Sequence, residues 1–65
     1  MKYFKLTDHQ NRGTIVRAEG RSFQQFFPGR GWLESGIMML YFNDDSPVYD
    51  AYVEISEEEA LRLTA

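Results

Sequence analysis

The sequence IMMLYFNDDSPVYDAYVEISEEEALRLTA, residues 37–65, holds the clearest structural signals of this chain. It opens with six apolar residues, 37–42, and a cluster of turn-forming residues, 43–47, follows them. Six apolar residues in a row fit either a strand buried on both faces or a short buried helix. We favour the strand, because the run is short, follows Gly36 and ends in turn residues. A short helix capped by Ser35 is the alternative, since Met and Leu are good helix formers.

The second half of this stretch predicts one strand and one helix. Apolar and polar side chains alternate over residues 48–55, which is typical of a half-buried antiparallel strand. Ser56 then begins the helix, because its hydroxyl oxygen can accept a hydrogen bond from the backbone N–H of Glu59 while the Glu59 carboxylate accepts from the N–H of Ser56. Glutamates in the first turn also suit the helix dipole. A helix of two turns must be held by packing, here through Ala60, Leu61 and Leu63.

The beginning of the chain predicts a β-hairpin. Residues 2–7 alternate in polarity and place Phe4 and Leu6 on one face of a strand. Residues 14–19 are rich in β-branched side chains and predict a second strand. Residues 8–13, with the sequence DHQNRG, have the composition of a turn.

The segment that follows, residues 22–27, has two interpretations. Gly20 and Arg21 fit a two-residue hairpin turn that leads into a third strand. Alternatively, Ser22 caps a single helical turn on which three phenylalanines share one face. We favour the strand, because Pro28 leaves no room for a helix of useful length.

Together these elements predict an α+β fold in one small domain, residues 1–65: an antiparallel sheet of four to five strands with the C-terminal helix packed on one face. A domain of this length buries only about 60% of the surface that its unfolded chain exposes. The chain nevertheless contains five Phe, four Tyr and one Trp. We expect Trp32 to lie in the core and some of the other bulky apolar side chains to remain on an interaction surface.

Charge is distributed unevenly along the chain. Residues 1–31 carry six basic against two acidic side chains, a net charge of +4, whereas residues 32–65 carry one against eight, a net charge of −7. Cysteine is absent, which excludes disulfides and thiolate metal sites and suits a reducing cytoplasm. No segment has the features of a targeting signal, and the longest apolar run is far shorter than the ~20 residues of a membrane-spanning helix. We therefore expect a cytoplasmic protein without a membrane partner.

The segment 52–60, YVEISEEEA, resembles the end of small bacterial and phage-associated proteins of uncharacterised function. The resemblance covers about the last fifteen residues, together with a strand-rich front half and a single Trp. Since no activity is known for those proteins, it implies no functional residue here.

Residue types that carry enzyme chemistry are sparse. His9 is the only histidine and lies in a turn without an evident partner, so no general base or nucleophile is predicted. The oxygen-rich turn with Asn43, Asp44 and Asp45 fails the EF-hand pattern, because Val48 stands where that loop requires Gly. The sequence PGRG lacks the Lys-Ser/Thr of a phosphate-binding loop. We expect no enzyme, no metal and no cofactor.

Two kinds of partner remain. A protein partner or a second copy of the chain would cover the surplus of apolar side chains and make the domain an interaction or accessory module. The candidate interaction surface consists of Phe23, Phe26, Phe27, Met38, Leu40, Phe42 and Tyr52. The alternative is weak binding of single-stranded nucleic acid by basic side chains interleaved with aromatic ones. The candidate nucleic-acid face consists of Lys5, Arg12, Arg17, Arg21 and Arg30.

Overall fold

Five antiparallel strands form one open sheet in the order β4-β3-β2-β1-β5. The computed structural model describes all residues from 1 to 65. The elements in chain order are β1 (Lys2–Leu6), β2 (Ile15–Glu19), β3 (Ser22–Phe27), β4 (Gly31–Glu34), α1 (Met38–Phe42), β5 (Tyr52–Ile55) and α2 (Glu57–Thr64). The predicted α+β fold, with its antiparallel sheet and C-terminal helix, is confirmed.

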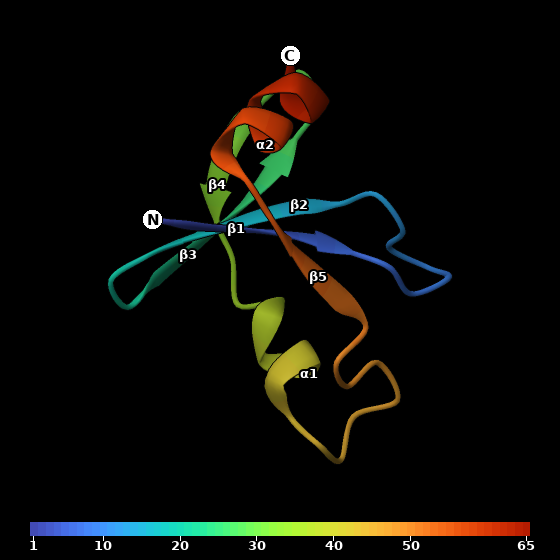
Figure 1. Ribbon diagram of the computed structural model, residues 1–65. Helices are drawn as coiled ribbons and strands as arrows, with labels where there is room; N and C mark the ends of the chain where they lie inside the picture. The colour runs from blue at the N-terminus through green and yellow to red at the C-terminus, as the bar shows by residue number, and fades with distance from the viewer.

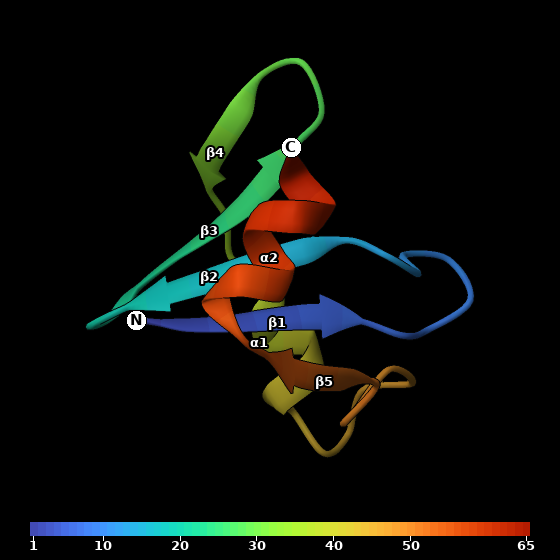
Figure 2. The same ribbon diagram turned by 45° about the horizontal axis from the view of Figure 1, so that its top comes forward.

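The two helices cover opposite faces of the sheet, α2 above it and α1 below it in Figure 1. Figure 2 looks onto the sheet with α2 in front and α1 behind. On the α1 face, Met38 and Tyr41 pack against sheet residues that include Leu6. On the α2 face, Ala60 packs against Tyr3 and Ile15. The alternation of side chains along β1 therefore supplies two separate small cores, one for each helix.

The first two hairpins form as their turn residues predict. β1 pairs with β2, and β2 pairs with β3 through the residue pair Glu19 and Ser22. Gly20 occupies the first position of the two-residue turn with a φ of 60°, a conformation that costs glycine nothing. The strand that we favoured over residues 22–27 is therefore confirmed.

The strand that we favoured over residues 37–42 is wrong, because this run forms helix α1. Its start is a turn in which the Ile37 N–H donates to Ser35 Oγ at 3.2 Å and the Met39 N–H donates to the Gly36 carbonyl at 3.1 Å. A helical turn satisfies several backbone N–H groups within the segment, whereas a strand would have to pair with an open edge of the sheet, β4 or β5. Ser35 bonds to the turn before the helix and does not cap it, since Ile37 is the N-cap residue.

Tyr41 anchors α1 to the loop between β1 and β2. Its hydroxyl donates a hydrogen bond of 2.6 Å to Asp8 Oδ1 and accepts one of 3.0 Å from Asn11 Nδ2. The Tyr41 side chain is fully buried. These two bonds satisfy the hydroxyl group that the tyrosine brings into the core. The five-residue helix is therefore held both by its packing on the sheet and by hydrogen bonds to the loop.

The strand that we expected over residues 48–55 forms only at its end, as β5. Asp50 interrupts it with a φ of 64°, which lies in the left-handed region, and its N–H donates to the Tyr41 carbonyl at 3.0 Å. Val48 and Ala51 still pack against the α1 core. The alternation of polarity there reflects a loop folded onto the core and does not reflect a strand.

Helix α2 begins at the predicted cap. The Glu59 N–H donates to Ser56 Oγ at 3.1 Å. The reciprocal half of the capping box is replaced by an ion pair, because Glu59 Oε2 lies 3.5 Å from Lys5 Nζ on the neighbouring strand β1. Of the three residues expected to hold this helix, only Ala60 is buried against the sheet, and its small side chain lets the helix approach closely. The expectation is wrong for Leu61 and Leu63, which are 59% and 47% exposed.

Candidate functional site

The outer flank of α1 exposes apolar side chains beside the sheet. Met39 and Phe42, three residues apart on the helix, are 76% and 46% exposed. Phe42 also contacts Phe23 and Tyr52 edge-to-face, with ring centroids 5.8 and 5.5 Å apart. We call Phe23, Met39, Phe42 and Tyr52 the α1 patch. Phe23 and Tyr52 are half-buried, so the patch is continuous with the core beneath it.

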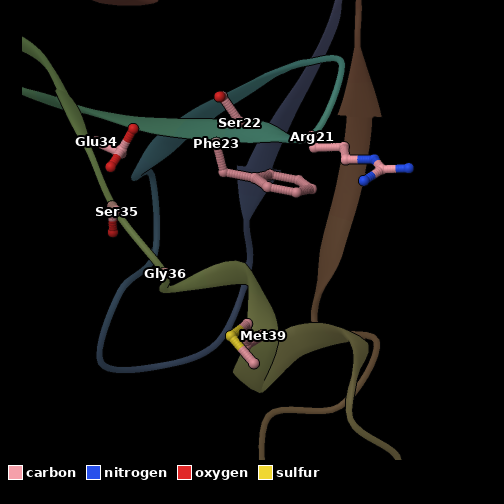
Figure 3. Close-up of a pocket in the computed structure, with 7 residues that line it drawn as sticks. All are labelled: Arg21, Ser22, Phe23, Glu34, Ser35, Gly36 and Met39. Atoms are coloured by element: carbon pink, nitrogen blue, oxygen red, sulfur yellow. The ribbon is translucent and has the colours of Figure 1, made fainter.

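A shallow hollow of about 500 Å³ borders the α1 patch. Figure 3 shows the Phe23 ring across its middle, Met39 of α1 on one side, and the end of β4 on another. A second, narrow pocket of about 40 Å³ shares part of this lining and is also lined by Met38 and Phe42 of α1. The hollow arises because the chain leaves β4 at Ser35 and Gly36 and bends away from the sheet to begin α1.

Charges of opposite sign stand at the rim of the hollow. Arg21 and Glu34 lie on opposite sides of Phe23, and the Arg21 guanidinium extends away from Glu34 (Figure 3). Both side chains are exposed. The single ion pair of the chain joins Lys5 to Glu59, so neither charge at the rim is paired within the chain. The hollow therefore offers an apolar floor between one free positive and one free negative charge.

The structure brings together only part of the interaction surface that the sequence predicted. Phe23, Phe42 and Tyr52 belong to the α1 patch, and Leu40 is 53% exposed on the other flank of the same helix. Phe27 is half-buried at the end of β3. Phe26 packs against Trp32 on the opposite face of the sheet, with ring centroids 5.4 Å apart. Met38 is only 1% exposed and is a core residue, which corrects its place in the predicted surface.

Trp32, which we expected in the core, is half-buried on the α2 face. Its ring contacts Tyr3 edge-to-face, and Arg17 covers it with the guanidinium carbon 4.3 Å from the ring centroid. Arg17 Nε also donates to Gln24 Oε1 at 2.6 Å. This side chain thus holds two neighbouring strands together and shields the indole.

The predicted nucleic-acid residues do not form one cluster in the structure. Lys5 and Arg17 lie on the α2 face, where Lys5 is paired with Glu59. Arg12 belongs to the loop between β1 and β2. Arg21 and Arg30 lie in the turns at the two ends of β3. Lys5 and Arg12 line a common hollow of about 500 Å³, and a nucleic-acid face stays a prediction.

The residues weighed for metal binding lie in the exposed loop between α1 and β5. Asn43 Oδ1 accepts from the Asp45 N–H at 3.0 Å, a hydrogen bond that shapes the turn. No group of three or more His, Asp or Glu side chains is placed to hold a metal ion.

Met39, Glu34 and the bend at Gly36 were not among the predicted site residues. We did not predict Met39 as a site residue because we favoured a strand for residues 37–42. A helical wheel over the same residues puts Met38 and Tyr41 on the inner side and leaves Met39 outside. The spacing of three residues between Met39 and Phe42, which puts both on one side of a helix, could therefore have identified the site.

No family model, curated protein or solved structure matches this chain. The two helices, of five and eight residues, are both too short to span a lipid bilayer. The candidate site is thus defined by its own geometry: an exposed α1 patch, a hollow beside it and two unpaired charges at the rim.

Proposed function

We propose that this chain is a small protein-interaction module that docks its partner through the α1 patch. The observation that carries this proposal is the exposure of Met39 and Phe42 on a helix whose inner side is fully committed to the core. Clustered exposed apolar side chains rimmed by polar ones mark interaction sites on small proteins. Met in particular adapts its shape to different partner surfaces.

The chemistry of the hollow fits a protein partner better than a small molecule. It is open and shallow, with Ser22, Ser35 and two opposite charges around the floor. Small-molecule sites enclose most of their ligand, whereas protein interfaces combine an apolar centre with a polar rim. Because cysteine-free chains suit a reducing compartment, we place the interaction in the cytoplasm.

The proposal is tested by cross-linking in intact cells that express the chain, followed by gel filtration. Met39→Asp places a charge at the centre of the α1 patch, and Leu61→Asp is its matched control. Leu61 is 59% exposed but belongs to α2, on the opposite face of the sheet. Both substitutions replace an exposed apolar side chain and should leave the fold intact, which circular dichroism checks.

We expect the wild-type chain and Leu61→Asp to elute in a cross-linked complex, and Met39→Asp to elute at the monomer mass of 7.6 kDa. A single buried charge at an interface is enough for this loss, since it lacks a partner there. The proposal is overturned if the wild-type chain stays monomeric in the cell, or if Met39→Asp retains the complex.

A further inference from the structure

We infer that the partner at the α1 patch is a second copy of this chain, held in a two-fold symmetric pair. The inference rests on the proposed function and names its partner. The argument comes from the rim of the hollow, where Arg21 and Glu34 flank the apolar floor and have no ion-pair partner of their own.

In a two-fold interface both copies use the same surface: if one residue of the first copy contacts a second residue of the other copy, the reverse contact is made as well. The surface must therefore be complementary to itself. A rim with one positive and one negative charge on opposite sides of an apolar centre meets this condition. Turning a second copy by 180° about an axis through the hollow brings Arg21 of each copy toward Glu34 of the other. A uniformly acidic or basic partner would satisfy one of these charges and repel the other.

The apolar side chains between these charges meet the same condition. Met39 protrudes at the edge of the hollow, 76% exposed. The axis that brings Arg21 toward Glu34 runs midway between them, past Phe23 and Met39 (Figure 3), so Phe23 and Met39 of each copy lie near the axis and face the same two side chains of the other copy. A flexible thioether against an aromatic ring is a favourable contact. The apolar centre and both charges are thus supplied by one surface used twice.

The test exploits the fact that one charge reversal spoils both ion pairs of the symmetric pair. In Arg21→Glu, each copy presents two acidic groups at the rim. In Glu34→Arg, each copy presents two basic groups. Analytical ultracentrifugation at low salt measures the dimer Kd of each purified chain. We expect each single variant to raise the Kd at least about tenfold, because two attractions become two repulsions.

An equimolar mixture of the two variants gives the decisive result. In the heterodimer, the two substituted positions face each other as a glutamate and an arginine, while the unchanged Arg21 of one copy meets the unchanged Glu34 of the other. Both ion pairs are thereby regained, so we expect the mixture to dimerise with a Kd close to that of the wild-type chain. The doubly substituted chain, Arg21→Glu with Glu34→Arg, should also form its own dimer. Since a misfolded variant would not be rescued by mixing, loss of folding cannot imitate this pattern.

The inference is overturned if the wild-type chain stays monomeric at millimolar concentration, or if the mixture is no tighter than the single variants. Its failure is distinct from failure of the proposed function. A chain that is monomeric when pure, but whose complex in the cell is lost on Met39→Asp, docks a different protein through the same patch. A chain that is monomeric in both settings contradicts both proposals.

Discussion

The Tyr41 hydroxyl shows how single side chains position the α1 patch. It donates to Asp8 and accepts from Asn11, and these bonds fix the helix whose outer flank carries Met39. The hydrogen bond from Tyr41 lowers the pKa of Asp8 below its usual 3.8. Burial, followed by the Asp8 carboxylate, raises the pKa of Tyr41 above its usual 10.0. The pair is therefore an ionised acid and a neutral phenol at neutral pH.

The lowered pKa of Asp8 predicts how stability depends on pH. The unfolded chain binds the proton more tightly, so the stabilisation by Asp8 is present above about pH 4 and is lost as the pH falls through the folded pKa. We expect Tyr41→Phe to be less stable at pH 7 and to lose less further stability between pH 7 and pH 3 than the wild-type chain.

Urea denaturation at several pH values measures this difference. The matched control is Tyr49→Phe, since Tyr49 is 52% exposed and its hydroxyl makes no hydrogen bond within the chain. An acid dependence of Tyr41→Phe as steep as that of Tyr49→Phe would contradict the assignment to the Tyr41–Asp8 bond.

Asp50 is the second residue with a defined backbone role. Its φ of 64° is uncommon for any residue but glycine, although Asp and Asn tolerate it. We expect Asp50→Val to lower the free energy of unfolding by about 1–2 kcal/mol, because a β-branched side chain clashes in this conformation. Asp50→Asn should remain within about 0.5 kcal/mol of the wild-type chain. Equal effects of both substitutions on the denaturation midpoint would speak against backbone strain.

At the scale of elements, α1 divides sharply into an inner and an outer side. Met38 is 1% exposed and its neighbour Met39 is 76% exposed. We expect Met38→Ala to cost about 2–5 kcal/mol of stability, as large-to-small changes in a core do. Met39→Ala should change stability by no more than about 0.5 kcal/mol. Chemical denaturation of dilute samples gives both values, and a similar cost at the two positions would refute the helical assignment.

Helix α2 depends on its cap, because eight residues are too few for a helix to be stable alone. Removing the Ser56 hydroxyl leaves the Glu59 N–H without its acceptor. We expect Ser56→Ala to reduce stability by about 1 kcal/mol. Ser22→Ala is the control, since Ser22 is exposed at the beginning of β3. A smaller loss for Ser56→Ala than for Ser22→Ala in thermal unfolding would exclude the cap as a stabilising contact.

The elements could be predicted where the local signal was sufficient. Alternating polarity predicted β1, the glycine turn at Gly20 predicted the β2–β3 hairpin, and Ser56 predicted the start of α2. Residues 37–42 could not be assigned locally, because six apolar residues satisfy both periodicities. The contacts that decide for a helix, from Tyr41 to Asp8 and Asn11, join residues about thirty positions apart. The strand predicted over residues 48–51 is wrong for a similar reason, since the Asp50 N–H donates to the carbonyl of the distant residue Tyr41.

At the scale of the whole molecule, a thin sheet is covered on both faces by short helices. Only eight of the 65 residues are buried, so neither core is large. Composition predicted that some apolar side chains would stay outside, but it could not say which. The position of the α1 patch follows from the placement of α1. Of the predicted surface residues, three lie in the α1 patch, while Phe26 packs on the other face of the sheet.

A docking surface at the α1 patch must be covered by protein in the cell. Hydroxyl-radical footprinting with mass spectrometry compares the oxidation rate of Met39 in cells with that in the dilute purified chain. Met38 is the internal control for burial, and Leu61, 59% exposed on α2, is the control for a free surface. We predict that Met39 reacts readily in the dilute chain and is strongly protected in cells, while Leu61 reacts in both. If Met39 reacts in cells as readily as in the dilute chain, the α1 patch is not a docking surface.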